Sequence, residues 1–302
     1  MTGRNVPARV LARFRVVFPL LLGAIFACKA PAFSKPEWTE PCEPFHIAGP
    51  LYYVGSADLA AYLIVTRDGS ILINSCLEEN VPMIEANVGK LGFKFADVKI
   101  LLISHAHWDH CAGSAEIKRI TGASYRVMDG DVAVVESGGR ADFNYGGDPD
   151  TYFPATKVDR VLHDGDVVSL GGVELVARLT PGHTKGCTTW TMTVDDGGQS
   201  RHVVIVGSPN VNDGYKLVDN PTYPEIAADY ERTFRVLKSL PCDLFLGAHG
   251  SYFNMHEKLE LAKTGSPAPF FDYRGYQAFI AEKESAFQDA LASQKAAAQK
   301  RN

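Results

Sequence analysis

Short apolar runs alternate with amphipathic segments along this chain of 302 residues. Brief apolar runs bounded by turn residues predict buried strands, and longer segments with apolar residues three and four positions apart predict helices. The predicted strands are 51–54, 60–66, 71–74, 99–104, 125–128, 167–170, 173–179, 188–194, 202–206 and 244–246. The predicted helices are 81–91, 114–121, 130–136, 223–240 and 274–299.

Two segments lack both patterns. Residues 33–47 are rich in Pro, and we expect an irregular arm there. Residues 137–157 combine Gly, Asp, Pro and aromatic residues. A loop of this length in a compact domain is usually functional or mobile, so we expect it to lie near a site.

The predicted strands and helices alternate in two series, about 45–180 and 181–302. This order favours an α/β fold built as a four-layer αββα sandwich, in which two sheets pack together and helices cover their outer faces. We therefore expect residues 33–302 to form one domain of two αβ halves. Histidines follow strands directly in both series, which places a site along one rim.

The N-terminal segment has the pattern of an export signal. Four arginines between positions 4 and 15 precede an apolar stretch, 16–27, that is too short to span a bilayer. Ala30-Pro31-Ala32 is a small-residue cleavage site, so residues 1–32 are predicted to be a signal peptide. The preceding Ile25-Phe26-Ala27-Cys28 resembles a lipoprotein cleavage box, which leaves a lipid anchor at Cys28 as an alternative. Both interpretations predict an exported, periplasmic protein.

Composition narrows the class of partner. The formal net charge of −5 argues against a nucleic-acid-binding surface, which usually carries a basic excess. We expect a small-molecule substrate and a monomeric protein. Five cysteines remain after the signal peptide, an odd number, so at least one is free or pairs between chains. A Cys42–Cys76 disulfide is one open alternative.

The densest chemistry directly follows strand 99–104, in the stretch His105-Ala106-His107-Trp108-Asp109-His110. Three imidazoles and a carboxylate are costly in a core, whereas imidazole is the commonest metal ligand. His105 and His107 are two apart, so an extended segment can aim both at one ion. Asp109 and His110 follow a bend and can face a second ion. Two ions with three protein ligands each need two further histidines.

His183 and His249 have the required setting. His183 lies in a Pro-Gly-His loop after strand 173–179, and His249 lies between small residues after strand 244–246. We expect both to complete the metal site. Four other histidines lack this setting and are interpreted as non-ligands: His46, His163, His202 and His256.

These motifs, Ser104–His110, Thr180-Pro-Gly-His-Thr184 and Gly247-Ala-His249, resemble those of the metallo-β-lactamase superfamily. Residues 206–218 and the aromatic-ended insert around Tyr145 are similar to class B, subclass 3 metallo-β-lactamases. The resemblance covers about 45–270 and implies the metallo-β-lactamase fold with two zinc ions per chain. It implies that the first zinc is bound by His105, His107 and His183. It implies that the second zinc is bound by Asp109, His110 and His249.

The resemblance also implies an activity. It is zinc-dependent hydrolysis of the β-lactam amide bond in penicillins, cephalosporins and carbapenems, which confers antibiotic resistance. A metal-bound hydroxide would be the nucleophile, and Asp109 would orient it. The alternative is another zinc hydrolase of this fold, a lactonase or thioesterase. Such relatives usually place a bridging Asp where this chain has Ser208, which favours the lactamase.

Three further residues are candidates for substrate contact. Tyr215 and Asn212 would contact the substrate carbonyl or carboxylate, although a turn that merely positions the chain is an equal alternative. Tyr145 would form part of an apolar wall over the site. One departure from the superfamily is Asn74, which stands where members commonly have an Asp that supports the metal loop.

Overall fold

Two stacked β-sheets form the centre of the molecule. The computed structural model describes residues 1–3, 35–264 and 269–300. The first sheet has the strand order β1-β2-β3-β4-β5-β6-β7, and the second has the order β12-β11-β10-β9-β8. The strands of the first sheet are Phe45–Ala48, Leu51–Tyr53, Tyr62–Thr66, Gly69–Ile73, Val98–Leu102, Ser124–Met128 and Arg160–Leu162. The strands of the second are Val167–Leu170, Val173–Leu179, Thr188–Asp196, Gln199–Val206 and Leu244–Gly247, which are β8 to β12.

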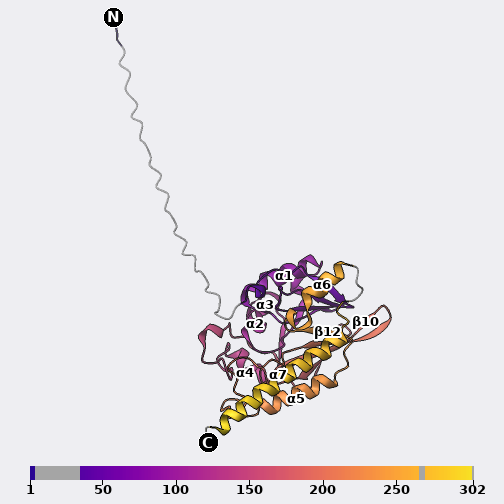
Figure 1. Ribbon diagram of the computed structural model, residues 1–302. Helices are drawn as coiled ribbons and strands as arrows, with labels where there is room; N and C mark the ends of the chain where they lie inside the picture. Colours follow the sequence, from indigo (N-terminus) through magenta and orange to yellow (C-terminus); the bar gives the residue numbers. More distant parts are fainter. Residues whose placement is uncertain (4–34, 265–268, 301–302) are drawn as a thin grey trace. The chain divides into compact units, whose positions relative to one another are not determined.

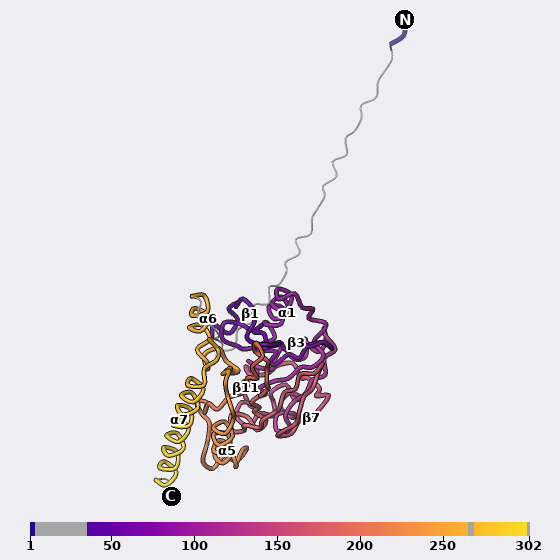
Figure 2. The backbone as a smooth tube through the Cα atoms, turned by 90° about the vertical axis from the view of Figure 1, so that its right-hand side faces the viewer, coloured from indigo at the N-terminus to yellow at the C-terminus, as the bar shows by residue number. Residues whose placement is uncertain are grey.

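Helices cover the outer face of each sheet. Helices α1 (Val81–Lys90), α3 (Ser114–Thr121) and α4 (Asp129–Glu136) pack on the first sheet. Helices α5 (Ile226–Ser239) and α7 (Tyr273–Gln299) lie side by side against the second sheet (Figures 1 and 2). This arrangement confirms the predicted four-layer αββα sandwich.

The alternation of side chains along the central strands explains the layering. In β4, Ile71 and Ile73 belong to the core between the sheets, whereas Leu72 belongs to the core beneath the helices. Successive side chains of a strand point to opposite faces, so a strand buried on both faces reads as a continuous apolar run. The core between the sheets continues through Trp190 of β10 to Phe234 of α5.

Several elements differ from the sequence prediction. The predicted irregular arm 33–47 is partly wrong, because Phe45–Ala48 forms β1, which pairs with β2. Strand β7 at Arg160–Leu162 and helix α6 at Met255–Lys263 were not predicted, since the strand is short and the helix has a weak apolar face. The bend after His107 is a short helix, α2, at Trp108–Cys111.

The sheets also divide the chain earlier than the predicted boundary near residue 180. Strands β8 and β9, at 167–179, belong to the second sheet, so the change of sheet falls between Leu162 and Val167. A turn signal cannot tell which sheet a hairpin joins, because pairing depends on distant strands. The cysteines of the described part, Cys42 and Cys76 included, are all unpaired, so the Cys42–Cys76 alternative is not formed.

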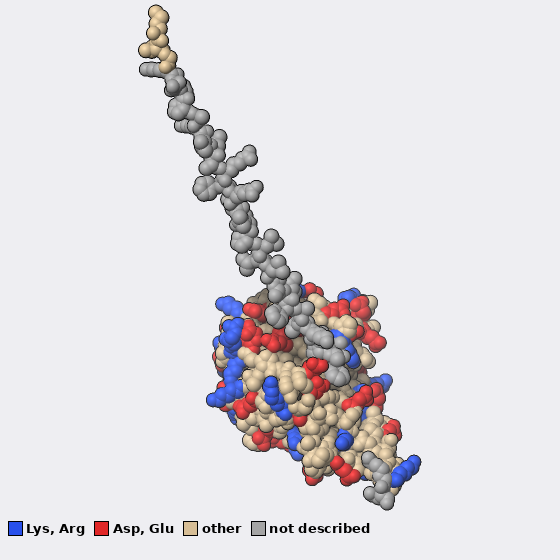
Figure 3. All heavy atoms as spheres, turned by 90° about the vertical axis from the view of Figure 1, so that its left-hand side faces the viewer, with Lys and Arg blue, Asp and Glu red and all other residues tan. Residues whose placement is uncertain are grey.

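The predicted signal peptide and the alternative anchor at Cys28 lie outside the described residues, apart from the first three positions. Among the described helices, none combines the length and apolarity required for a membrane crossing. On the face shown in Figure 3, basic and acidic side chains are interspersed.

Candidate metal centre

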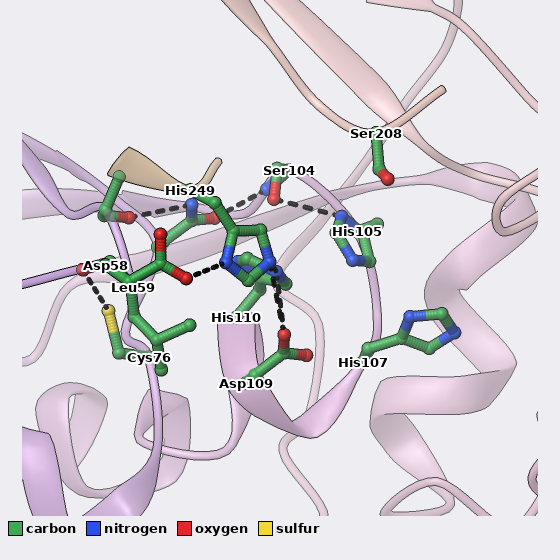
Figure 4. A network of polar contacts seen from close by, with 12 residues as sticks. Asp58, Leu59, Cys76, Ser104, His105, His107, Asp109, His110, Ser208 and His249 are labelled. Carbon is green, nitrogen blue, oxygen red and sulfur yellow. Dashed lines mark hydrogen bonds and ion pairs between the residues drawn. The ribbon is translucent and has the colours of Figure 1, made fainter. Parts of the chain in front are cut away.

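Three loops that follow strand ends bring the six predicted ligands to one rim. His105 follows β5, His183 follows β9 and His249 follows β12. Backbone hydrogen bonds hold these loops together: Thr188 N–H donates to the Ser104 carbonyl, and Ala60 N–H donates to the Ala248 carbonyl. The fold therefore brings together loops that are far apart in sequence, as the strand-end pattern predicts (Figure 4).

The first group consists of His105, His107 and His183. One ring nitrogen of each lies within 4.8 Å of the others, and all three residues are buried. The ring centroids are 4.6 to 4.9 Å apart. Nothing in the packing requires three imidazoles to face one another, so a shared ion is the simplest reason for the arrangement.

The second group consists of Asp109, His110 and His249. Asp109 Oδ2 lies 3.1 Å from His110 Nε2 and 3.4 Å from His249 Nε2. The two Nε2 atoms are 3.2 Å apart. A tetrahedral ion with bonds of about 2.0–2.2 Å has ligand atoms roughly 3.3–3.6 Å apart, so these three atoms already form one face of such a shell.

The protonation states of His105, His183 and Asp109 suit metal binding, whereas burial lowers the pKa of His107 but the neighbouring Asp142 carboxylate raises it above the usual value. Burial lowers the pKa of His105 and His183 well below the usual value, and neighbouring imidazoles lower it further, so both rings are neutral and offer a lone pair. Burial alone would raise the pKa of Asp109, but His110 and His249 lower it far below its usual range. Metal ligands of these types bind in their deprotonated forms.

A metal ion in the second group would replace a proton on the His249 ring. Burial lowers its pKa, but hydrogen bonds to Asp109 and Asp58 raise it to about 9. This shift favours a protonated His249 ring when no metal ion is bound. Binding of a metal ion would displace that proton, which couples metal affinity to pH. The donor set of imidazoles with one carboxylate fits zinc, and it is present in full.

Comparison with known proteins identifies the family. The model of the metallo-beta-lactamase superfamily matches residues 60–249. This chain belongs to the metallo-β-lactamase superfamily. The match begins at Ala60, two residues before β3, and ends at His249, so it includes all six predicted ligands.

Solved structures refine the comparison. The FEZ-1 metallo-β-lactamase from Legionella gormanii is 56% identical with a TM-score of 0.84, covering 85% of this chain and 98% of that chain. BJP-1, a subclass B3 metallo-β-lactamase of Bradyrhizobium japonicum, is 40% identical with a TM-score of 0.81, covering 87% and 98% of the two chains. The class B3 di-zinc enzyme LRA-12, from an Alaskan soil metagenome, is 38% identical with a TM-score of 0.82, covering 86% and 98%. The predicted resemblance to subclass 3 enzymes is confirmed.

A curated relative covers less of the chain. A probable metallo-hydrolase of Burkholderia pseudomallei (strain 1710b) is 34% identical over 108 residues, which are 36% of this chain and 35% of that protein.

Carboxylates and carbonyls orient the ligand histidines of this superfamily member. Asp58 Oδ2 accepts a hydrogen bond from Nδ1 of His249 at 2.9 Å, and Figure 4 shows the His249 ring between Asp58 and Asp109. The Asn210 carbonyl accepts from Nδ1 of His183 at 2.8 Å. A proton fixed on Nδ1 leaves the Nε2 lone pair of each ring for a metal.

Asp131, at the start of α4, joins two ligand loops. Its Oδ2 accepts from the backbone N–H of Ala106 and from the hydroxyl of Thr184, each at 2.8 Å. Its Oδ1 accepts from the N–H of Gly186, also at 2.8 Å. One buried carboxylate thus holds the loop between His105 and His107 against the loop that carries His183.

Asn74 holds the backbone directly before His105 in place. Its Oδ1 accepts from Ser104 N–H at 2.7 Å, and its Nδ2 donates to the Ala60 carbonyl at 3.0 Å. An Asp could accept the first bond but not donate the second, so Asn is matched to this site. Its φ of 66° is a left-handed conformation that Asn tolerates better than most residues.

The structure separates the three predicted substrate contacts. Tyr145 and Asn212 line a cleft of about 770 Å³ that also contains His107, Asp109 and His249. The Tyr145 ring lies 5.3 Å from that of His107, and Asn212 Nδ2 donates to the Tyr145 hydroxyl at 3.0 Å. Both are therefore placed where a substrate would lie.

Tyr215 is placed differently. It is only 3% exposed, does not line the cleft, and donates its hydroxyl to the His183 carbonyl at 2.8 Å. This geometry favours the alternative in which the turn positions the chain. We interpret Tyr215 as a positioning residue for the His183 loop.

Sequence reasoning missed Asp58, Asp131 and Asp142. Asp142 lies in the 137–157 loop that was predicted to be near a site, and its buried Oδ2 is 3.7 Å from His107 Nε2. Asp131 lies in a predicted helix, and Asp58 in a short connection, so neither had a local signal. An acidic residue beside a ligand histidine can be found only after the fold brings them together.

Proposed function

We propose that this protein is a zinc-dependent β-lactamase that opens the amide bond of penicillins, cephalosporins and carbapenems and so confers resistance to them. The observation that carries the proposal is a pair of adjacent three-ligand groups, each of which contributes two residues to the lining of one cleft. Three protein ligands per ion leave a position for water or substrate, as catalytic zinc sites require. The 56% identity with FEZ-1 over 98% of its chain supports the choice of substrate class.

Each of the two groups would hold one zinc ion. His105, His107 and His183 would hold one zinc, and Asp109, His110 and His249 the other. Zinc bound there would polarise the lactam carbonyl and lower the pKa of water to about 7.

Residues of the chain orient the reactants. Asp109 lines the cleft, and its ionised carboxylate can accept a hydrogen bond from the attacking water and hold a proton for the leaving nitrogen. The Asn212 amide and the Tyr145 hydroxyl place polar hydrogens in the same cleft, where they can contact the substrate. Asp58, Asp131 and Tyr215 keep the ligand loops in register before substrate arrives.

Ser208 favours the lactamase over the lactonase or thioesterase alternative. It follows β11 and its hydroxyl lies 3.1 Å from that of Tyr252. A neutral side chain there adds no carboxylate between the two metal groups. A lactonase or thioesterase of this fold usually has a bridging Asp at this position, so here its negative charge would have to come from another residue.

The test compares a carbapenem and a homoserine lactone as substrates of purified, zinc-loaded protein, with and without a chelator. We expect chelator-sensitive loss of the carbapenem and little lactone turnover. Asp109→Ala should lose about one zinc per chain, whereas His163→Ala, an exposed histidine outside the site, should keep both. Fast lactone turnover with no carbapenem loss would overturn the proposal.

We further propose that the protein is periplasmic and monomeric. The support for export is the basic and apolar pattern of residues 1–32. Cell fractionation and mass determination of the mature N-terminus would test cleavage after Ala32 against lipidation at Cys28.

A further inference from the structure

The cleft continues beyond the metal groups along helix α7. One part of its lining consists of His107, Asp109, His183 and His249. Another part consists of Tyr252 and one side of α7, and we call this part the α7 arm. The residues of the α7 arm are Tyr252, Gly275, Ala278, Phe279, Glu282 and Lys283.

The helix wall of the α7 arm is open where two of its residues, Gly275 and Ala278, are small. Gly275, Ala278 and Glu282 are three and four positions apart, so they lie on the same side of α7. Gly275 is required by the helix start, where an added Cβ would lie 2.1 Å from Asp272 Oδ2. Ala278 is exposed and adds little bulk beside it. The wall therefore leaves space that a larger residue would fill.

The floor of the α7 arm is aromatic and fixed. The Tyr252 ring lies 5.0 Å from the His249 ring and 5.1 Å from the Phe279 ring. The Tyr252 hydroxyl accepts from Asn210 Nδ2 at 2.7 Å and lies 3.1 Å from Ser208 Oγ, which holds the ring in place. Phe279 in turn packs on Phe245 at 5.5 Å. Two ring-to-ring contacts thus connect His249, a predicted metal ligand, to Phe279 of α7.

The charges of the α7 arm are paired. Lys283 Nζ lies 3.0 Å from Glu282 Oε1 and 5.3 Å from the centre of the Phe279 ring. The buried Lys258 Nζ, behind the floor, lies 2.9 Å from Asp272 Oδ2. Because Lys283 is paired with Glu282, the α7 arm offers a ligand no unpaired charge from α7. It offers flat apolar surface, which suits an uncharged aromatic ring.

We propose that the α7 arm binds an uncharged aromatic substituent of the substrate, attached outside the β-lactam ring system. The proposal rests on the proposed β-lactamase function. The reacting amide lies at the metal groups, and the substituent reaches over Tyr252 toward Phe279. Residues of α7 therefore set the preference among β-lactams that share one reactive nucleus.

The test fills the arm without touching the metal groups. Ala278→Trp places a large ring in the arm, and Ala281→Trp places the same ring on an exposed position of α7 that does not line the cleft. Substrates are used in two matched pairs: penicillins with an acetyl or a phenylacetyl side chain, and cephalosporins with one acyl group and a methyl or a phenyl-bearing group at C3. Zinc content and thermal unfolding verify that both variants are folded and loaded.

We expect Ala278→Trp to lower kcat/KM about tenfold for the aromatic member of at least one pair, mainly by raising KM. The methyl-bearing members and the Ala281→Trp variant should stay within about twofold of wild type. A second variant, Phe279→Leu, removes the flat surface and should reduce the same aromatic preference. Equal effects of Ala278→Trp on both members of both pairs, or no effect, would overturn the proposal.

Binding of the same four compounds, measured by calorimetry, separates this proposal from the proposed function. If the protein turns over these compounds and Ala278→Trp leaves turnover unchanged, the proposal for the α7 arm is wrong and the proposed hydrolase function stands. If the protein turns over none of these compounds but binds the aromatic ones, and Ala278→Trp weakens that binding, the proposed hydrolase function is wrong and the proposal for the α7 arm stands.

Discussion

Asp58 and His249 are 191 residues apart in sequence, yet Asp58 Oδ2 lies 2.9 Å from Nδ1 of His249. Burial would raise the pKa of Asp58, but the bonds from His249 and from Ser251 N–H lower it well below its usual value. The carboxylate is therefore ionised and holds the proton of the ring on Nδ1. This leaves Nε2 directed at Asp109 and His110.

In the proposed two-zinc site, Asp58→Ala should weaken binding of the zinc assigned to Asp109, His110 and His249 by about 10- to 100-fold, because the His249 ring loses its orientation and basicity. Asp58→Asn should have a smaller effect, since the amide oxygen still accepts from Nδ1. Zinc affinity is measured by competition with a chromophoric chelator. Asp68→Asn, an exposed carboxylate in the turn before β4, is the matched control. Unchanged zinc affinity in Asp58→Ala would contradict the assigned role.

Asp131→Asn should lower the free energy of unfolding by about 3 kcal/mol. The buried carboxylate accepts three hydrogen bonds, and an amide would replace one acceptor with a donor that faces another donor. Chemical denaturation measures the loss, and amide exchange at Ala106 and Gly186 should become faster. Asp129→Asn, exposed on the same helix, should change stability by less than about 0.5 kcal/mol. Equal behaviour of the two variants would refute the assigned contacts.

Gly182→Ala should destabilise the His183 loop by about 3 kcal/mol or more. Gly182 has φ of +123°, and an added Cβ would lie 2.7 Å from the Tyr230 ring. Tyr230 cannot move freely, because its hydroxyl donates to the Asn210 carbonyl at 2.6 Å. Thermal unfolding measures the effect. Gly147→Ala, where an added Cβ meets no atom within 4 Å, should be tolerated. A stable Gly182→Ala protein would show that the loop can rearrange.

Asp272 predicts a pH dependence of stability. Burial would raise its pKa, but hydrogen bonds from Lys258 and from Gly275 N–H lower it below the usual value. A group whose pKa falls on folding stabilises the protein above its unfolded pKa, about 3.9, and loses that contribution as pH falls through the folded value.

Asp272→Asn keeps the acceptor for Gly275 N–H and removes the charge opposite Lys258. We expect it to lose about 1 kcal/mol above about pH 5, with the difference from wild type shrinking below about pH 4. Denaturation across this pH range tests the sign. Glu260→Gln removes an exposed charge paired with Lys263 and should show almost no difference at any pH. A difference for Asp272→Asn that grows on acidification would contradict the pairing.

Local pattern alone predicted the six ligands, which the structure brings together at one rim. His105, His183 and His249 each follow an apolar run that ends in small or polar residues, and a strand end is where a loop can present a side chain. The spacing within His105–His110 also separates the two groups. Each of these signals spans only a few residues, so it can be recognised in the sequence without knowledge of the fold.

Tertiary structure decided which residues support those ligands. Asp58, Asp131 and Asp142 reach their partners across loops and helices, and Tyr215 turned inward to the His183 carbonyl instead of facing the cleft. The membership of β8 and β9 in the second sheet was likewise decided by long-range pairing. The physical reason is common to all of these features. Periodicity reports whether a side chain is buried, whereas its partner depends on how distant strands come into register.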